Sequence, residues 1–154
     1  MTDIRPLTLA DRALVSKFLH DHPPVISEQT FTNLFIWQPS RPVFVSEIDE
    51  SLIFLVKSAE VEGDYILYGP PVGAITIPDI FSAFDNGLTG AVRIPEESIK
   101  GFPAEKFIIN DDRDNADYVY RVSDLAELGG RHYAKKRNKI KQCLKNHTCE
   151  YVPI

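Results

Sequence analysis

The sequence predicts an α/β protein of the α+β kind, in which helices flank a mixed, mostly antiparallel sheet. Helix-like and strand-like segments alternate along the chain, and such alternation favours a mixed sheet covered by helices over a sandwich or a bundle. Three strand-like segments follow one another across short polar breaks, as in an antiparallel meander. The 154 residues are enough for one ordinary domain with its own core. We therefore expect a single domain over residues 1–154.

Capping and periodicity signals place the individual elements. Thr8 and Asp11 have the spacing of a capping box, in which the carboxylate reaches back to a free amide. Ser27 is the expected cap of a second helix, and Gln38-Pro39 stops this helix. We expect strands at 4–7, 43–48, 52–57, 65–68, 91–94, 106–109, 118–122 and 149–154. We expect helices at 9–20, 28–37, 78–84 and 130–146, with a short helix at 96–100.

Composition narrows the class of protein. Hydrophobic residues make up 44% and charged residues 25% of the chain, which is typical of a soluble globular protein. The longest apolar runs, such as 52–56, are too short to be a transmembrane segment, and the N-terminus lacks a secretory pattern. Two cysteines, Cys143 and Cys149, are too few to staple a domain of this size. These features predict a cytoplasmic protein or one at the cytosolic face of a membrane.

Charge is distributed unevenly along the chain. The net charge is −5, yet residues 131–154 hold seven lysines and arginines against one glutamate, a net of +6, so residues 1–130 carry −11. Such polarity indicates that the basic end meets an anion, a nucleic acid backbone or an acidic partner domain. The alternative is a solvated helix face that balances its own acidic domain.

Four segments together resemble a known family. They are Asp-Asn-Ala-Asp-Tyr-Val-Tyr at 114–120, the stretch from Asp124 to Arg131, Lys-Lys-Arg-Asn at 135–138 followed by Ile140, and Phe-Thr-Asn-Leu-Phe-Ile-Trp at 31–37. In these residues the chain resembles a family of uncharacterised bacterial proteins that is grouped with the C-terminal catalytic domain of phosphatidylglycerol lysyltransferases. The order of the expected elements fits this family as well.

The resemblance implies a fold and a class of activity. The implied fold is the GNAT-like acyl-CoA N-acyltransferase fold, present twice in tandem, similar to the transferases that build peptidoglycan cross-bridges from aminoacyl-tRNA. This chain would be the first of the two GNAT-like domains, and the second GNAT-like domain of the same protein would be its partner. The strand-like segment at 149–154 has no further element to flank it, which also predicts a continuation into that second domain.

Arg137 is the most informative residue of the helix at 130–146. At 100° per residue, one stripe of this helix holds Tyr133, Arg137, Ile140 and Leu144, and we expect the stripe to be buried. A guanidinium in such a position requires an anion or a set of carbonyls. Arg137 either pairs with a carboxylate such as Asp114 or Asp117, or holds a phosphate or carboxylate of the substrate bidentately.

Further residues are candidates for substrate binding. Lys136 borders the stripe and would share the anion, while Gly130 and Arg131 would shape a cleft. Tyr120 offers a hydroxyl that orients a substrate or is simply packed. Asn33 and Trp37 lie one helical turn apart, so they could present an amide and an indole to one site. The alternative is that both belong to the core and that Asn33 forms a local hydrogen bond. The lysines on the outer face of the helix at 130–146 would bind the phosphates of tRNA or an anionic lipid headgroup. The alternative is that they only solvate the helix.

Several motifs are absent from the sequence. No arginine or glutamine opens a Gln/Arg-x-x-Gly-x-Gly/Ala loop of the kind that holds acyl-CoA, so no cofactor is assigned to this chain and the donor is either aminoacyl-tRNA or acyl-CoA. His20-Asp21-His22 lacks a third ligand group at a matching spacing, so we predict no metal. The sequence predicts half of an acyl- or aminoacyl-transferase that acts on an amine or hydroxyl and is inactive as this fragment, with catalytic residues unassigned. The alternative is a non-catalytic module that binds an anionic polymer, a lipid headgroup or a protein partner.

Overall fold

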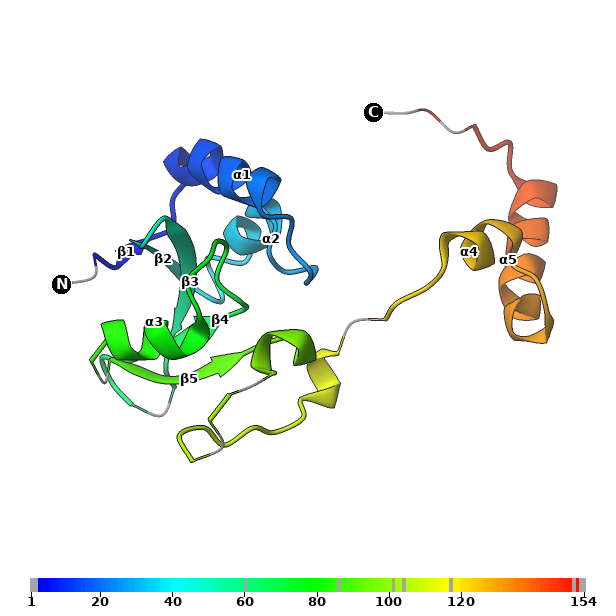
Figure 1. Ribbon diagram of the computed structural model, residues 1–154. Helices are drawn as coiled ribbons and strands as arrows, with labels where there is room; N and C mark the ends of the chain where they lie inside the picture. The colour runs from blue at the N-terminus through cyan, green and yellow to red at the C-terminus, as the bar shows by residue number, and fades with distance from the viewer. Residues whose placement is uncertain are drawn as a thin grey trace. The chain divides into compact units, whose positions relative to one another are not determined.

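The computed structural model describes residues 3–59, 61–85, 87–100, 102–103, 105–116, 118–150 and 152. The chain divides into two compact units, the sheet unit, Met1–Asp117, and the helical unit, Tyr118–Ile154 (Figure 1). The expectation that residues 1–154 form one domain, followed by a second, stays a prediction.

Five strands in the spatial order β1-β2-β3-β4-β5 form the centre of the sheet unit. β1 to β4 pair antiparallel, whereas β5 pairs parallel to β4 after the helix α3. The predicted mixed, mostly antiparallel sheet with helices is confirmed. The elements of the unit are β1 (Arg5–Pro6), η1 (Leu9–Asp11), α1 (Arg12–Asp21), α2 (Phe31–Ile36), β2 (Val43–Ile48), β3 (Ser51–Lys57), β4 (Tyr65–Tyr68), α3 (Ile77–Ala83), β5 (Leu88–Val92), η2 (Glu96–Ile99) and η3 (Arg113–Asn115).

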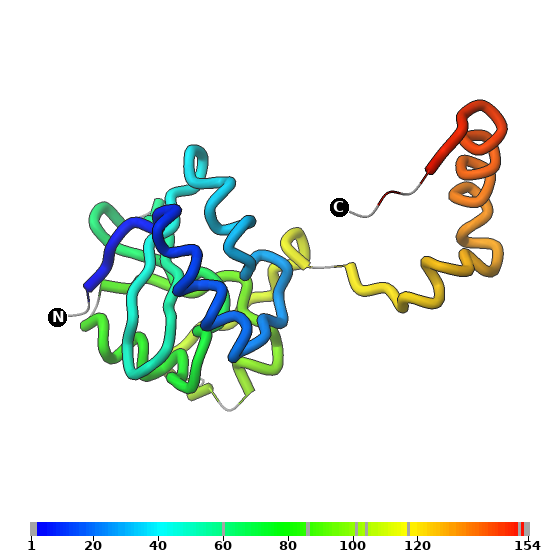
Figure 2. The backbone as a smooth tube through the Cα atoms, turned by 90° about the horizontal axis from the view of Figure 1, so that it is seen from above, coloured from blue at the N-terminus to red at the C-terminus, as the bar shows by residue number. Residues whose placement is uncertain are grey.

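β3 is buried because helices cover both faces of the sheet. Leu52 and Phe54 belong to a cluster that includes residues of α1 and α2, whereas Ile53 and Leu55 belong to a cluster that includes residues of α3. Side chains alternate between faces along a strand, so a strand covered on both sides is a continuous apolar run. Figure 2 looks down on the sheet unit with α1, in blue, lying over the strands.

The capping box predicted at Thr8 is present and holds the start of the first helix. The backbone amide and the hydroxyl of Thr8 donate to the Asp11 carboxylate at 2.7 and 2.8 Å, and Arg5 forms an ion pair with it at 2.6 Å. Burial raises the pKa of Asp11, but the hydrogen bonds from Thr8 and Arg5 and the charge of Arg5 outweigh it and lower this pKa below its ordinary value. The second helix, in contrast, is capped by Thr30 and not by the predicted Ser27.

Some of the predicted strands are wrong. The strand expected at 91–94 lies at Leu88–Val92, and residues 106–109 form no strand. Phe107 there packs its ring against Phe81 and Phe102 at 5.4 and 5.2 Å, so its apolar side chain is used without strand pairing. Cys149, Glu150 and Val152 are not in a strand either, and the rest of the strand predicted at 149–154 lies outside the described residues.

The helical unit contains α4 (Val122–Glu127), η4 (Arg131–Tyr133) and α5 (Ala134–Asn146). The strand predicted at 118–122 is wrong, because residues 118–121 are irregular and α4 begins at Val122. The helix predicted at 130–146 is confirmed, with a first turn of 3-10 type. No helix in the described ranges combines the length and hydrophobicity that a bilayer crossing requires.

Candidate functional site

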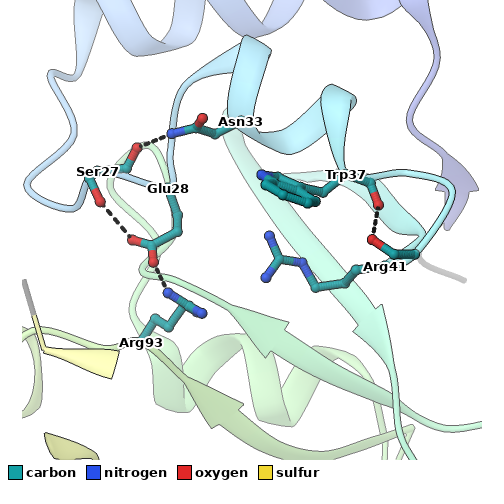
Figure 3. Close-up of a pocket in the computed structure, with 7 residues that line it drawn as sticks. Ser27, Glu28, Asn33, Trp37, Arg41 and Arg93 are labelled. Atoms are coloured by element: carbon teal, nitrogen blue, oxygen red, sulfur yellow. Dashed lines mark hydrogen bonds and ion pairs between the residues drawn. The ribbon is translucent and has the colours of Figure 1, made fainter. Parts of the chain in front are cut away.

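A surface pocket of about 430 Å³ lies in the sheet unit where the end of β5 meets the segment around α2 (Figure 3). We call it the Arg41 pocket. Its lining residues are Ser27, Glu28, Asn33, Trp37, Ser40, Arg41 and Arg93.

Asn33 and Trp37 both line this pocket, as their spacing of one helical turn predicts. The Asn33 side-chain amide donates to the Ser27 carbonyl at 2.7 Å, which ties α2 to the preceding loop. Trp37 follows the last residue of α2, and 56% of its surface is exposed. Its carbonyl accepts the Arg41 amide at 2.8 Å and the Ser40 hydroxyl at 3.2 Å. The end of α2 therefore fixes the turn that carries Arg41, and the substrate-binding role of Asn33 and Trp37 stays a prediction.

Arg41 brings a cation against the buried ring of Tyr68. Its guanidinium carbon lies 4.5 Å from the ring centroid, and Tyr68 is only 2% exposed. Within the described part of the chain, Arg41 Nε and the Tyr68 hydroxyl are buried without a hydrogen-bond partner of good geometry. Burial raises the pKa of Tyr68, and the charge of Arg41 and a hydrogen bond from its guanidinium oppose this rise. Arg41 and Tyr68 therefore lie close together, although the contact between them is not well aligned.

Arg93 supplies the second cation of the pocket and is already neutralised. Its guanidinium forms an ion pair with Glu28 and donates to the Asn115 side-chain oxygen at 2.8 Å. Arg93 follows β5 with a φ of +58°, a left-handed conformation that is uncommon for residues other than glycine. Arg93 also lies 5.5 Å from the Tyr68 ring centroid. Glu28, Arg41 and Arg93 were not predicted as site residues, because no local pattern links positions so far apart in sequence.

Arg137 in the helical unit is held by backbone carbonyls. Its Nη1 donates to the carbonyl of Gly130 at 2.7 Å and to that of Leu128. Of the carboxylates expected as partners, Asp117 lies outside the described residues and Asp114 belongs to the sheet unit. Leu128 and Gly130 have φ values of +50° and +78°, so both residues turn the chain sharply. Arg137 therefore fastens the turn that joins α4 to α5.

Lys136 and Tyr120, two predicted site residues, meet in the helical unit. The Lys136 ammonium lies 5.7 Å from the ring centroid of Tyr120 and 5.8 Å from that of Tyr133. Tyr118 stacks on Tyr120 with centroids 6.5 Å apart. Arg131 lies at the start of η4 and is exposed. The unit thus combines exposed cations with aromatic rings, a combination that suits anionic and nucleic acid ligands.

The apolar stripe predicted on the last helix is not buried. Ile140 is 47% and Leu144 62% exposed, because no described element of the helical unit packs over them. The Sγ atoms of Cys143 and Cys149 lie 3.7 Å apart on the exposed surface. The hydrogen bond with Cys143 and its charge raise the pKa of Cys149, which makes its thiol a weaker nucleophile at neutral pH. Among the described residues, no three His, Cys, Asp or Glu side chains gather as metal ligands do.

The family model described as phosphatidylglycerol lysyltransferase, C-terminal, matches residues 21–154. Among solved structures, the chain is similar to a conserved protein of unknown function from Bacteroides thetaiotaomicron VPI-5482, with a TM-score of 0.76 and 25% identity. The similarity covers 95% of this chain and 51% of the other, so this chain spans about half the length of that protein. No curated protein matches the chain. Because the family model covers well over half of it, the chain belongs to the phosphatidylglycerol lysyltransferase C-terminal family.

Proposed function

We propose that the protein transfers an acyl or aminoacyl group to an amine or hydroxyl acceptor. The observation that carries this proposal is the family match over residues 21–154, because the name of the family states lysyl transfer with phosphatidylglycerol. Aminoacyl-tRNA is the first candidate donor and acyl-CoA the second. The reaction takes place on the cytoplasmic side, where both donors are made.

The proposal includes a GNAT-like fold for the sheet unit. Its support is the order of elements, in which four antiparallel strands with two helices after the first precede a helix and a parallel β5. The second GNAT-like domain of the pair is proposed from the solved structure, of which this chain covers 51%. The proposal places the acceptor site between the two domains, so this chain alone would be inactive.

The helical unit is proposed to hold the anionic part of a substrate. Lys136 supplies the charge, supported by its position over the Tyr120 and Tyr133 rings. Arg137 acts as a positioning residue, because its hydrogen bonds to the carbonyls of Leu128 and Gly130 fix the turn before α5. The exposed lysines of α5 follow the phosphates of tRNA or of an anionic lipid headgroup.

A transfer assay with the protein at its full natural length tests this function. Labelled lysyl-tRNA is incubated with the protein and with vesicles that contain phosphatidylglycerol, and the label in the lipid fraction is counted. A parallel reaction offers acetyl-CoA and a mixture of amines. We expect transfer from one donor, and we expect Lys136→Gln to weaken tRNA binding and to reduce the slope of log affinity against log salt by about 0.7–0.9, the value for one phosphate contact.

Lys17→Gln is the matched control, because Lys17 is an exposed lysine of α1 whose ion pair is with Asp21 on the same helix. It should leave both affinity and salt slope unchanged. If the folded protein transfers from neither donor, the proposed reaction is wrong. If it nevertheless binds tRNA or anionic vesicles, the function is that of a binding module.

The binding module is the second candidate function, and one observation favours it. The helical unit brings the exposed cation Lys136 next to the rings of Tyr120 and Tyr133, and cations beside aromatic rings suit an anionic ligand. A module that only binds needs no further group beside these cations.

A further inference from the structure

Arg41 is a half-buried cation without a counterion among the described residues. The pocket contains two arginines and one glutamate, and the glutamate is engaged by Arg93 and by the Ser27 hydroxyl at 3.3 Å. The described ion pairs include none to Arg41. Withdrawing a cation from water without an opposite charge is unfavourable. The pocket therefore has a net charge of +1 that a bound anion would compensate.

The guanidinium of Arg41 is held in place before any ligand arrives. The Trp37 carbonyl fixes the Arg41 backbone, and the Tyr68 ring supports the guanidinium at 4.5 Å. In Figure 3 the guanidinium lies between Trp37 and Arg93 at the centre of the pocket. Arginine in such a fixed position binds phosphate through two parallel N–H groups.

Trp37 adds a flat apolar surface next to this cation. Trp37 lines the pocket and is 56% exposed, so its indole is accessible to a ligand. Nucleobases stack on tryptophan whatever their sequence, because every base has a π face. A ligand with both a phosphate and a base could contact Arg41 and Trp37 at once.

We infer that the Arg41 pocket binds a nucleotide, with the phosphate on Arg41 and the base on Trp37. The pocket volume of about 430 Å³ falls within the range of small-molecule sites. The choice of a nucleotide rests on the proposed function, because both candidate donors, aminoacyl-tRNA and acyl-CoA, carry an adenosine nucleotide. Asn33 donates its amide nitrogen to the Ser27 carbonyl, which holds its side chain at the pocket wall.

Trp37 is the only tryptophan of the chain, so its fluorescence reports directly on the pocket. The 154-residue chain is titrated with AMP, adenosine and inorganic phosphate. We expect saturable quenching by AMP, with an affinity about tenfold or more above that for either part alone, because only AMP makes both the charged and the stacking contact. Titration with 3′-phosphoadenosine and with a CCA trinucleotide then distinguishes a CoA-type nucleotide from an RNA end as the source.

Variants assign the binding to these two side chains. Arg41→Gln should weaken AMP binding about tenfold or more, since a charge-assisted contact is lost. Arg41→Lys, which keeps the charge over Tyr68 but not the two parallel donors, should fall in between. Arg12→Gln is the matched control, because Arg12 is an exposed arginine of α1 outside the pocket. Trp37→Phe, followed by calorimetry, should weaken AMP but not inorganic phosphate.

The inference is wrong if AMP does not quench Trp37 saturably, if AMP and inorganic phosphate bind equally, or if Arg41→Gln and Arg12→Gln behave alike. Thermal melting of each variant ensures that only folded protein is compared, and Arg41→Lys replaces Arg41→Gln if the latter does not fold. Nucleotide binding without group transfer would overturn the proposed function alone. Transfer by a protein whose Arg41 pocket does not bind AMP would overturn this inference alone.

Discussion

The two units of the chain are stabilised in different ways. Sixteen of the described hydrophobic residues of the sheet unit are buried, whereas none of the described residues of the helical unit is. Burial of apolar surface is the main favourable term in folding, so the sheet unit obtains its stability from its core. The helical unit depends on local hydrogen bonds, such as those that Arg137 donates to Leu128 and Gly130. The same substitution should therefore change the free energy of unfolding by different amounts in the two units.

The largest contrast is expected from removing a leucine in each unit. Leu55 in β3 is fully buried, whereas Leu144 in α5 is 62% exposed. Leu55→Ala should lower the free energy of unfolding by about 2–5 kcal/mol, because it leaves a cavity in the core. Leu144→Ala should change it by less than about 0.5 kcal/mol, as surface substitutions do. Urea denaturation followed by circular dichroism measures both, and equal losses would show that the helical unit has a core of its own.

The same contrast explains which elements the sequence could predict. The run of apolar residues at 52–56 and the capping box at Thr8 depend on neighbours in sequence, and both are found as expected. The strand predicted at 118–122 has the right residue types, but Tyr118 and Val119 are 89% and 92% exposed and pair with no strand in the described ranges. Strand propensity describes how a residue fits a sheet that already exists, and the sequence alone does not provide that sheet.

The residues of the candidate site differ in how far the sequence indicates them. The spacing of one helical turn predicts that Asn33 and Trp37 lie together, and both line the Arg41 pocket, whereas their role in binding and that of Arg137 stay predictions. Arg41 and Arg93 both lie against the ring of Tyr68. No local spacing in the sequence predicts this arrangement. The carbonyl partners of Arg137 were also missed, because they depend on the left-handed conformation of Leu128, which residues other than glycine adopt rarely.

Glycine substitutions should give the next largest effect. A Cβ at Gly73 would lie 2.7 Å from the Cα of buried Ser51, whereas a Cβ at Gly130 meets nothing within 4 Å. Both glycines have positive φ, +142° and +78°, so alanine is strained by about 1–3 kcal/mol at either position. Gly73→Ala should cost more than this range, because the collision with Ser51 adds to the strain.

The two glycine variants need different measurements. Gly73→Ala should lower the urea midpoint of the sheet unit. Gly130→Ala should leave that midpoint unchanged and should appear only as faster amide hydrogen exchange at the start of α5. A midpoint that moves equally in both variants would contradict the separation of the two units.

A smaller effect, with a pH dependence, is expected at Asp11. Asp11→Asn removes the charge that accepts from Thr8 and Arg5, at a cost of about 1–2 kcal/mol near pH 7. The folded pKa of Asp11 lies below its ordinary value of 3.8, so the stabilisation is complete above pH 3.8. It is lost as the pH falls below 3.8 through the folded value. Wild-type and variant stabilities should therefore converge in acid, and a constant difference would rule out the charge as the cause.

The smallest effect is expected from Tyr68→Phe, although Tyr68 is among the most buried residues of the sheet unit. Its hydroxyl has no well-formed hydrogen bond within the described residues, and removing an unsatisfied buried group costs little or even stabilises. We expect a change of less than about 1 kcal/mol at pH 7, measured by urea denaturation. The ring that supports Arg41 remains, so the nucleotide titration should also be unaffected.

Alkaline pH distinguishes this variant further. Burial raises the pKa of Tyr68 above its ordinary value of 10.0, so the neutral hydroxyl favours the folded state. The corresponding stability is present below pH 10 and decreases as the pH rises through the folded value. Tyr68→Phe should remove this component, leaving the variant more stable relative to wild type above pH 10 than at pH 7. If wild type and variant instead lose stability in parallel, the hydroxyl is not held in its neutral form by burial beneath Arg41.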